Sequence, residues 1–160
     1  MTRKDNMYRN LARLRETHGR KHFMFLPETF ILPAELDRLQ TEMIKNPEKK
    51  WIVKPASSSQ GKGIFITQDC NEIPQKEQMV VSEYLWKPLL IDGTKFDLRV
   101  YVALTSINPL RIYIYEDGLA RFATGKYNDK TNTKQARYTH LTNYSLNKNS
   151  TNFVENKDAM

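Results

Sequence analysis

The feature that most limits the fold of this chain is a pair of apolar segments, Trp51–Val53 and Ile64–Thr67, separated by a loop of small residues. Apolar runs on either side of such a loop predict a β-hairpin. The loop, Ala56–Gly63, contains Gly61 and Gly63, which can adopt positive φ angles and turn successive backbone N–H groups toward one anion. Such a hairpin can bind phosphate, although a flexible surface hairpin without a ligand fits the same residues.

Side chains in and beside the loop add further groups that suit an anion. Ser57–Ser59 provide hydroxyl donors, Lys62 provides charge, and Lys54 at the end of the first strand can reach the same ligand. The loop is not a Walker A phosphate loop. Ala56 replaces the first glycine of that motif, and Gly63 follows Lys62 at the position where serine or threonine holds the metal.

Composition limits the class of protein. A length of 160 residues fits one domain, and 39% hydrophobic residues are typical of a globular protein. The sequence has no apolar run of about 18 residues and begins with polar residues, so we expect no membrane contact and a cytoplasmic location. A single cysteine, Cys70, excludes an internal disulfide and disfavours a cysteine-based zinc site.

The formal net charge of +7 predicts attraction to polyanions. Nucleic acid, an anionic membrane surface, a nucleotide and an acidic protein tail all fit this charge. Because the basic residues are spread along the chain, without a long Lys/Arg block or a recognisable nucleic-acid-binding motif, nucleic acid is the less favoured partner.

Two amphipathic helices are predicted before the hairpin. Apolar residues at helical spacing indicate the first helix over Lys4–His18 and the second from Ala34 to about Lys45. Between them, Phe23–Leu26 and Thr29–Leu32 are apolar but separated by Pro27. This interruption favours two short extended segments.

A further strand is predicted at Met79–Leu85, and its last residues offer a possible purine edge. A purine requires an extended backbone that presents one donor and one acceptor beside an apolar slot. Ser82, Glu83, Tyr84 and Leu85 can supply this edge, while an ordinary core strand explains the same residues equally well.

The segment Lys95–Val102 alternates with a period of two after a turn at Asp92–Gly93. Lys95, Asp97 and Arg99 fall on one face and apolar residues on the other, so we expect one charged face and one core face. The charged row can be a solvated surface. It can also bind a ribose hydroxyl through Asp97, and phosphates or a carboxylate through Lys95 and Arg99.

A meander of three strands is predicted from this point. Its strands lie at residues 95–102, 110–115 and 119–124, with turns at Asn108–Pro109 and Asp117–Gly118. We expect a polar loop, a segment rich in hydrogen-bonding side chains and a poorly ordered tail at residues 129–135, 140–145 and 147–160.

Taken in order, these segments resemble the tubulin tyrosine ligase-like family, most closely its polyglutamylase members. The matching segments are Trp51–Pro55, the loop that follows it, Lys95–Arg99, Gly118–Ala123 and His140–Ser145, and the opening Thr2–Asn6 is also similar. The resemblance covers nearly the whole chain. It implies an ATP-grasp fold of the α+β class, with antiparallel sheets and flanking helices, that is incomplete at the C-terminus.

The same resemblance implies a division of the chain and a place for ATP between two lobes. A helical and extended segment would occupy residues 1–50, a partial ATP-grasp core residues 51–146, and a polar tail residues 147–160. ATP phosphates would contact Lys54, the Gln60–Gly61 backbone and Lys95, and the ribose would contact Asp97. The adenine would face residues 82–85.

Other positions of the sequence match further family roles. Thr142 and Asn143 would also contact ATP, while Arg121 and Tyr144 would bind the incoming amino acid. Arg99 and Arg121 would act as catalytic cations that stabilise the developing phosphate charge.

The reaction that the resemblance implies is the ATP-dependent addition of free glutamate to glutamate side chains in tubulin C-terminal tails, through an acyl-phosphate. Its cofactors would be ATP and Mg²⁺, its partners tubulin or microtubules, and its location the cytoskeleton, with the cilium or basal body as further sites. Glycine or tyrosine as the donor stays open. The alternative is a non-catalytic module that binds nucleotide or acidic tubulin tails.

Two departures from the family pattern affect this expectation. Gln60 stands where many relatives have arginine, near the acceptor peptide. The chain also ends before the family's C-terminal glutamate and asparagine that hold magnesium, so we expect no metal ligands here. For the same reason we expect weak nucleotide binding, little ligase activity and some uncovered apolar surface from this chain alone.

Overall fold

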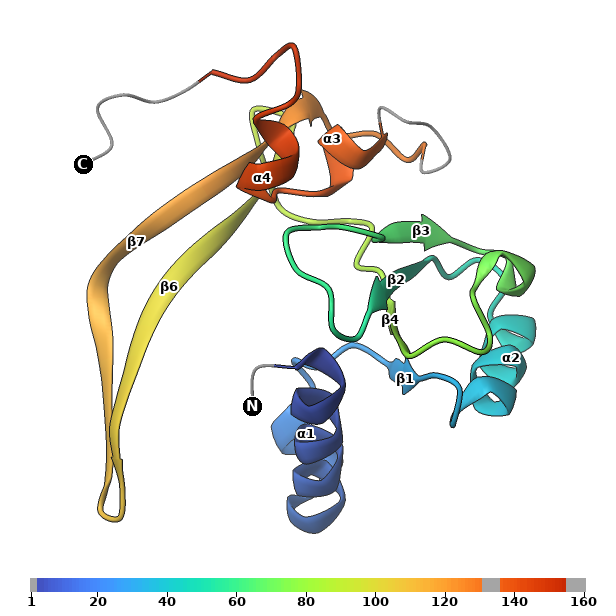
Figure 1. Ribbon diagram of the computed structural model, residues 1–160, viewed down its shortest axis with the longest axis vertical. Helices are drawn as coiled ribbons and strands as arrows, with labels where there is room; N and C mark the ends of the chain where they lie inside the picture. The colour runs from blue at the N-terminus through green and yellow to red at the C-terminus, as the bar shows by residue number, and fades with distance from the viewer. Residues whose placement is uncertain (1–2, 131–135, 155–160) are drawn as a thin grey trace. The chain divides into compact units, whose positions relative to one another are not determined.

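The computed structural model describes residues 3–130 and 136–154, and the chain divides into two compact units, Met1–Lys87 and Pro88–Met160. Each unit has its own sheet, flanked by helices, and the described strands all pair antiparallel (Figure 1). The expected α+β class with antiparallel sheets is confirmed. The boundary that we expected after residue 50 falls inside the first unit, between α2 (Leu36–Lys45) and β2 (Trp51–Pro55).

The first unit contains a four-stranded sheet in the order β1-β4-β2-β3. The predicted hairpin is β2 with β3 (Phe65–Thr67), in a register that pairs Trp51 with Thr67. The other predicted strand, β4 (Met79–Glu83), lies at the centre between β2 and β1 (Thr29–Ile31). Its central position explains why its residues are apolar on both faces.

The core of this unit forms where α2 packs on one face of the sheet. Leu39 and Met43 of the helix contact a cluster that includes Trp51, Val53 and Val81, and the side chains of those three strand residues are fully buried. Residues 51 and 53 face the core, so residues 52 and 54 face the other way, as the two-residue period of a strand requires. The buried face therefore fixes the side from which Lys54 projects.

The N-terminal helix was predicted correctly, but the extended segment after it was not. The helix α1 spans Lys4–His18. The expected strand at Phe23–Leu26 is instead a 3-10 helix at Arg20–Phe23 followed by a turn, in which the Leu26 N–H donates to the Phe23 carbonyl at 3.0 Å. Apolar content suggested a strand here, but local i→i+3 bonds satisfy the backbone without a neighbouring strand.

The second helix begins later than expected, at Leu36 rather than Ala34. Residues 32–35 form a turn that ends β1, and the carboxylate of Glu35 accepts a hydrogen bond from the Ile31 N–H at 2.8 Å. This side chain satisfies the backbone where the strand stops. The helix can then start only after the turn is complete.

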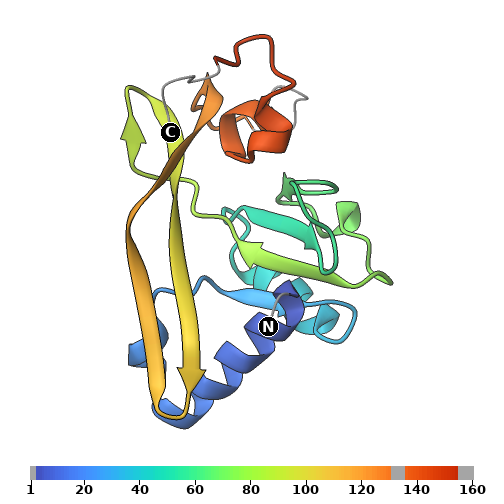
Figure 2. The ribbon, with the colours of Figure 1, turned by 60° about the vertical axis from the view of Figure 1, so that its left-hand side comes forward.

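The second unit is dominated by a long two-stranded hairpin, β6 (Thr94–Ile107) with β7 (Leu110–Lys126), and a short third strand, β5 (Leu90–Ile91), pairs with β6 (Figure 2). The turns expected at residues 92–93 and 108–109 are present. The three-strand meander was wrong, because β7 runs without interruption through residues 117–118.

A bulge in β7 explains why Asp117–Gly118 resembled a turn. Pairing passes from Val100–Gly118 to Val102–Ile114, so three residues of β7 oppose one residue of β6. A Cβ atom on Gly118 would lie 2.6 Å from the carbonyl oxygen of Arg99. Glycine is therefore needed here for the close approach of two strands and not for a change of direction.

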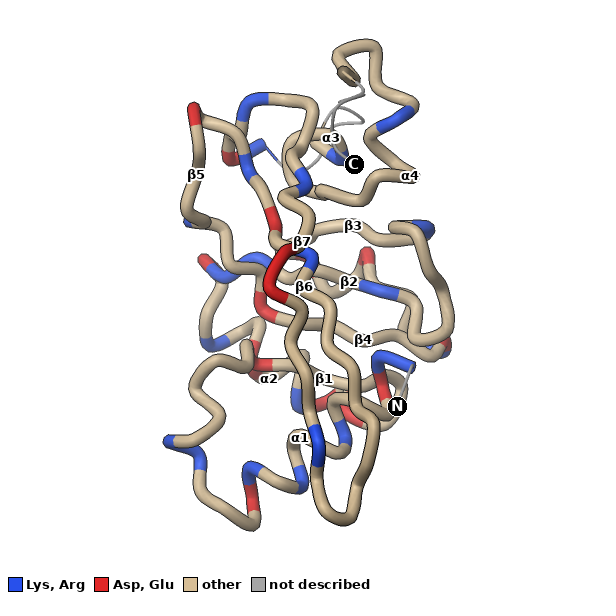
Figure 3. The backbone as a smooth tube through the Cα atoms, turned by 90° about the vertical axis from the view of Figure 1, so that its left-hand side faces the viewer, with Lys and Arg blue, Asp and Glu red and all other residues tan. Residues whose placement is uncertain are grey.

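The expected core face of β6 was also wrong. Leu98, Val100 and Val102 are 66%, 54% and 59% exposed. The outer half of the hairpin, residues 100–115, carries a single charged side chain, at Arg111 (Figure 3). Alternation along the strand identified an apolar face correctly, but it could not show whether another layer covers that face. The expectation of uncovered apolar surface agrees with these exposures.

The short helices α3 (Ala136–His140) and α4 (Tyr144–Asn147) pack against β7, at the end of the hairpin opposite to its tip (Figure 1). Residues 148–154 continue in turns, and residues 155–160 of the expected tail lie outside the described residues. Part of the polar loop expected at residues 129–135 lies outside them as well. Among the described helices, none has the length and apolar character required to cross a bilayer.

Candidate functional site

The loop between β2 and β3 has the conformation that the glycines predicted. Gly61 and Gly63 have φ angles of 77° and 69°, and Gln60 joins them at 60° although it is not a glycine. The loop is closed by its own bonds, because the Ser58 hydroxyl donates to the Lys62 carbonyl at 3.0 Å. Gly63 also approaches Pro55 closely, and a Cβ atom there would lie 2.9 Å from the proline Cγ. A side chain at either glycine would distort this structure.

Two lysines meet at the base of this loop. Lys54 projects from β2, and Lys4 reaches it from the first turn of α1, where its ammonium donates to the carbonyls of Pro55, at 3.2 Å, and of Ser58. Burial lowers the pKa of Lys54, and the charge of Lys4 lowers it further. Among the described residues no carboxylate pairs with Lys4 or Lys54. The loop therefore has a positively charged base that an anion would stabilise.

Fewer residues of the predicted adenine edge have free backbone groups than the sequence suggested. Ser82 is buried inside the sheet, with its hydroxyl 3.0 Å from that of Thr29. The N–H groups of Glu83 and Tyr84 already donate to the carbonyls of Glu28 and Lys50, at 2.8 and 2.7 Å. Leu85 follows the strand and is 66% exposed. An adenine contact through this edge would thus involve the backbone from Leu85 onward, and it remains a prediction.

The charged row of β6 meets β7 in the second unit. Asp97 lies directly opposite Arg121, whose guanidinium Nε donates to both carboxylate oxygens at 3.1 Å. Burial by itself would raise the pKa of Asp97, but hydrogen bonds from Arg121 and Thr142 and the charge of Lys95 outweigh it and lower this pKa. The hydrogen bond and charge of Asp97 raise the pKa of Arg121 in turn.

Lys95 connects this row to the segment that was predicted to be rich in hydrogen bonds. Its ammonium donates to the carbonyl of His140 at 2.9 Å. Thr142 lies near Asp97 and contributes to the lowered pKa of that carboxyl, and Asn143 is the residue that precedes α4. Lys95, Asp97, Arg121 and Thr142 are thus brought together, as the predicted roles require.

Arg99 and Tyr144 lie less close to this cluster. Arg99 is exposed, two residues further along β6, and its guanidinium lies 5.8 Å from the centre of the Tyr101 ring. Tyr144 is 54% exposed and packs edge-on against Phe153, with ring centres 5.7 Å apart. Their proposed contacts with substrates remain predictions.

The predicted convergence of Lys54 with Lys95 and Asp97 concerns residues in different units. Lys54 belongs to the first unit, and the other two belong to the second. Each half of the site is described by its own geometry, and their approach to one ligand stays a prediction.

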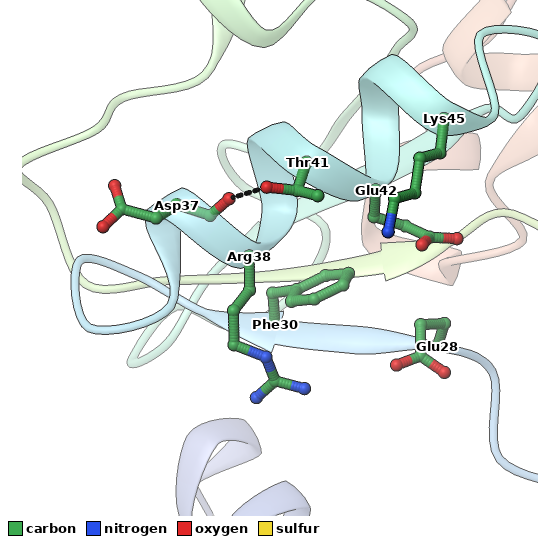
Figure 4. A pocket seen from close by; sticks show the side chains of 7 residues that line it. All are labelled: Glu28, Phe30, Asp37, Arg38, Thr41, Glu42 and Lys45. Carbon is green, nitrogen blue, oxygen red and sulfur yellow. Dashed lines mark hydrogen bonds between the residues drawn. The ribbon is translucent and has the colours of Figure 1, made fainter.

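A cavity of about 330 Å³ lies beside α2 and β1 and is shown in Figure 4. It contains none of the residues predicted to bind nucleotide. Two of its polar side chains make local contacts: the Thr41 hydroxyl donates to the Asp37 carbonyl at 2.8 Å, and the Arg38 guanidinium lies 5.8 Å from the centre of the Phe30 ring. We therefore do not assign a function to this cavity.

Sequence reasoning missed two residues of the site. Lys4 was noted only as part of the opening that resembles the family, and its contact with the loop requires the tertiary fold. Asn147 was placed in the polar tail, but it is 1% exposed and binds the segment that contains Thr142. In the described part of the chain, no group of three His, Cys, Asp or Glu side chains could hold a metal ion.

Comparison with known proteins identifies the family of this chain. The Tubulin-tyrosine ligase family matches residues 1–160. Tubulin polyglutamylase TTLL5 of Mus musculus is 47% identical over 99% of this chain, and the match covers 12% of that relative. Tubulin polyglutamylase TTLL6 of Homo sapiens is 49% identical over 94% of this chain, and the match covers 17% of that relative.

A third relative, Tubulin monoglutamylase TTLL4 of Homo sapiens, is 44% identical over 99% of the chain, which covers 13% of it. The chain therefore spans less than a fifth of the length of these curated relatives. Because the match extends over all 160 residues, this chain belongs to the tubulin-tyrosine ligase family.

Proposed function

We propose that this chain forms part of an ATP-dependent ligase that adds glutamate to glutamate side chains of tubulin C-terminal tails at the cytoskeleton. The names of the relatives, all tubulin glutamylases, support the substrate and the reaction. The observation that carries the proposal is the half-buried Lys54 ammonium, whose charge lies near that of Lys4 at the base of a glycine loop.

Lys4 and Lys54 place two positive charges close together at the base of the loop. Burial of Lys54 disfavours its charged form, and the nearby charge of Lys4 adds to that cost, which lowers the pKa. A polyphosphate would neutralise both ammonium groups and could accept hydrogen bonds from the Gln60–Gly61 backbone. The half-site in the first unit therefore fits the phosphates of ATP better than it fits a neutral ligand.

The second half-site fits the remaining roles. Lys95, Asp97, Thr142 and Asn143 would contact ATP, and Arg121, with Tyr144, would bind the carboxylate of free glutamate. Asp97 holds the Arg121 guanidinium in one orientation through the bonds described above. A guanidinium fixed in this way loses little entropy when it binds a second carboxylate.

In the proposed reaction a tail carboxylate attacks the γ-phosphorus of the substrate ATP and releases ADP. The amino group of glutamate then attacks the acyl-phosphate carbon, an amide bond forms and inorganic phosphate leaves. Lys54, Arg99 and Arg121 are the cations that this chain can offer to the developing charge. No three His, Cys, Asp or Glu side chains are grouped in the described part of the chain, so none of its residues is assigned to Mg²⁺, which the family resemblance implies as a cofactor.

The second candidate is a non-catalytic module that binds acidic tubulin tails. The net charge of +7 favours it, because long-range attraction to a glutamate-rich peptide needs no metal and no ATP. The two candidates differ in their need for nucleotide. A module would bind tail peptides equally well with and without ATP.

A titration of the chain with ATP in the presence of Mg²⁺ tests the first candidate. We expect saturable heat of binding and competition by ADP. The companion assay measures incorporation of labelled glutamate into tubulin, with labelled glycine and tyrosine as alternative donors. Failure of the chain to bind ATP at millimolar concentration would reject the ligase proposal. Incorporation that is measurable and equal for all three amino acids would reject glutamate as the specific donor.

A further inference from the structure

Asn147 is polar, yet its side chain is among the most completely buried in this protein. Its side chain is 1% exposed, although the sequence around it is polar. The carboxamide oxygen accepts hydrogen bonds from the N–H and the hydroxyl of Thr124, both at 3.0 Å. The carboxamide nitrogen donates to the carbonyls of Leu141, at 2.8 Å, and Asn143, at 3.0 Å.

These four bonds use the full capacity of the side chain, since a carboxamide has two donors and two acceptor positions. Its orientation is also fixed, because the Thr124 N–H can only donate and the two carbonyls can only accept. No group of Asn147 is left for a ligand. Any role in the site must therefore be exerted through the residues that it holds.

The residues that Asn147 holds surround Thr142. Its bonds tie the backbone on both sides of Thr142 to β7, and Lys95 on β6 binds the preceding carbonyl, that of His140, at 2.9 Å. Thr142 lies close enough to Asp97 to lower the pKa of that carboxyl, and Asp97 pairs with Arg121. Both strands of the hairpin thus fix the segment that presents Thr142 to the charged row.

Other residues of similar size could not replace this carboxamide. Aspartate has the same shape, but it has no N–H donors, so its second oxygen would face two carbonyl oxygens at bonding distance. Leucine would leave the partners in β7 and in the 141–143 segment unsatisfied. Each loss is costly because the site is buried. Position 147 therefore requires a side chain with two acceptor positions and two N–H donors, which asparagine provides, and not only a side chain of the right volume.

We propose that Asn147 is a positioning residue of the nucleotide site, which acts by holding Thr142 against Asp97. This inference rests on the proposed function, since it assumes that Thr142 and Asp97 contact ATP. It assigns a specific task to a residue that touches no substrate.

The test compares Asn147→Asp with a matched control, Asn149→Asp. Asn149 is exposed, and its carboxamide makes a bond to the Ser145 carbonyl at 3.1 Å. We expect Asn147→Asp to weaken ATP affinity by about tenfold or more, the scale of loss when outer partners of a binding site are removed. We expect Asn149→Asp to bind ATP like the wild-type chain.

A double-mutant cycle separates positioning from a general loss of structure. If Asn147 acts through Thr142, the fold loss of ATP affinity in the double variant should be smaller than the product of the fold losses in Asn147→Asp and Thr142→Val. With Lys54→Met, which lies in the other unit, the losses should multiply. If Asn147→Asp does not fold, Thr124→Val removes a single bond to the carboxamide and should show the same pattern with a smaller loss.

Hydrogen exchange without ATP gives an independent readout. We expect the amides of residues 141–146 to exchange faster in Asn147→Asp but not in Asn149→Asp. The positioning role is overturned if Asn147→Asp binds ATP as the wild-type chain does, or if its effect multiplies with that of Thr142→Val. A wild-type chain that binds no ATP would instead overturn the proposed function, and the positioning role with it.

Discussion

Replacing Lys54 with methionine should separate the stability of this chain from its affinity for nucleotide. Methionine keeps most of the length of the side chain and removes the charge. The pKa of Lys54 lies below its ordinary value of 10.5, chiefly because the half-buried ammonium is partly removed from water. At a pH between the lowered pKa of the folded state and the ordinary pKa of the unfolded state, the unfolded state binds more protons. Wild-type stability therefore increases as the pH rises through this range.

The sign of the stability effect follows from this shift. At neutral pH the wild-type protein carries a half-buried charge at Lys54 that its fold disfavours, and the Lys54→Met variant does not. We therefore expect the ligand-free variant to be at least as stable as the wild type at pH 7. The difference should shrink at alkaline pH, where the wild-type Lys54 loses its proton.

The effect on nucleotide has the opposite sign. Loss of one charge-assisted hydrogen bond costs about 1.5–3 kcal/mol, which corresponds to a loss of about 10- to 150-fold in affinity. ATP titrations and thermal unfolding of the same samples measure both quantities. Lys76→Met is the matched control, because it removes one lysine charge from an exposed position in the same unit. The two variants therefore have the same net charge. Unchanged ATP affinity in Lys54→Met would refute the assignment of the phosphate site.

The other predictions concern the second unit and the overall charge. Gly118→Ala should lower the free energy of unfolding by about 1–3 kcal/mol, because its Cβ would lie 2.6 Å from the Arg99 carbonyl, and an unchanged denaturation midpoint would contradict this. Asp97→Asn should be less stable than the wild type at neutral pH. This difference should disappear only as the pH falls below the ordinary aspartate pKa of 3.8, since the pKa of the folded state is lower still, and a difference already lost at pH 6 would count against the ion pair. Affinity for a glutamate-rich tubulin tail peptide should fall as salt is raised from low to physiological concentration, whereas salt-independent binding would exclude attraction by the +7 charge.

The sequence by itself determined most of the local elements of the first unit and the strand that begins the hairpin of the second. Periodicity identified α1, the β2–β3 hairpin and the strand β4, because burial of one side of an element forces its apolar residues into the period of that element. Glycines marked a loop with positive φ angles. The row Lys95, Asp97 and Arg99 followed from the two-residue period of a strand, and the order of the motifs was sufficient for the family.

Only the tertiary structure decided which of these residues contact one another and which surfaces are covered. Lys4 contacts the carbonyl of Pro55, which lies 51 positions away in the sequence. The pairing of Asp97 with Arg121 depends on a strand register that a bulge modifies. Alternation in β6 marked an apolar face but could not show that this face is exposed. Asn147 illustrates the same limit. A polar residue can be buried only where specific partners are brought to it, and the partners of Asn147 lie on β7 and in the segment before α4.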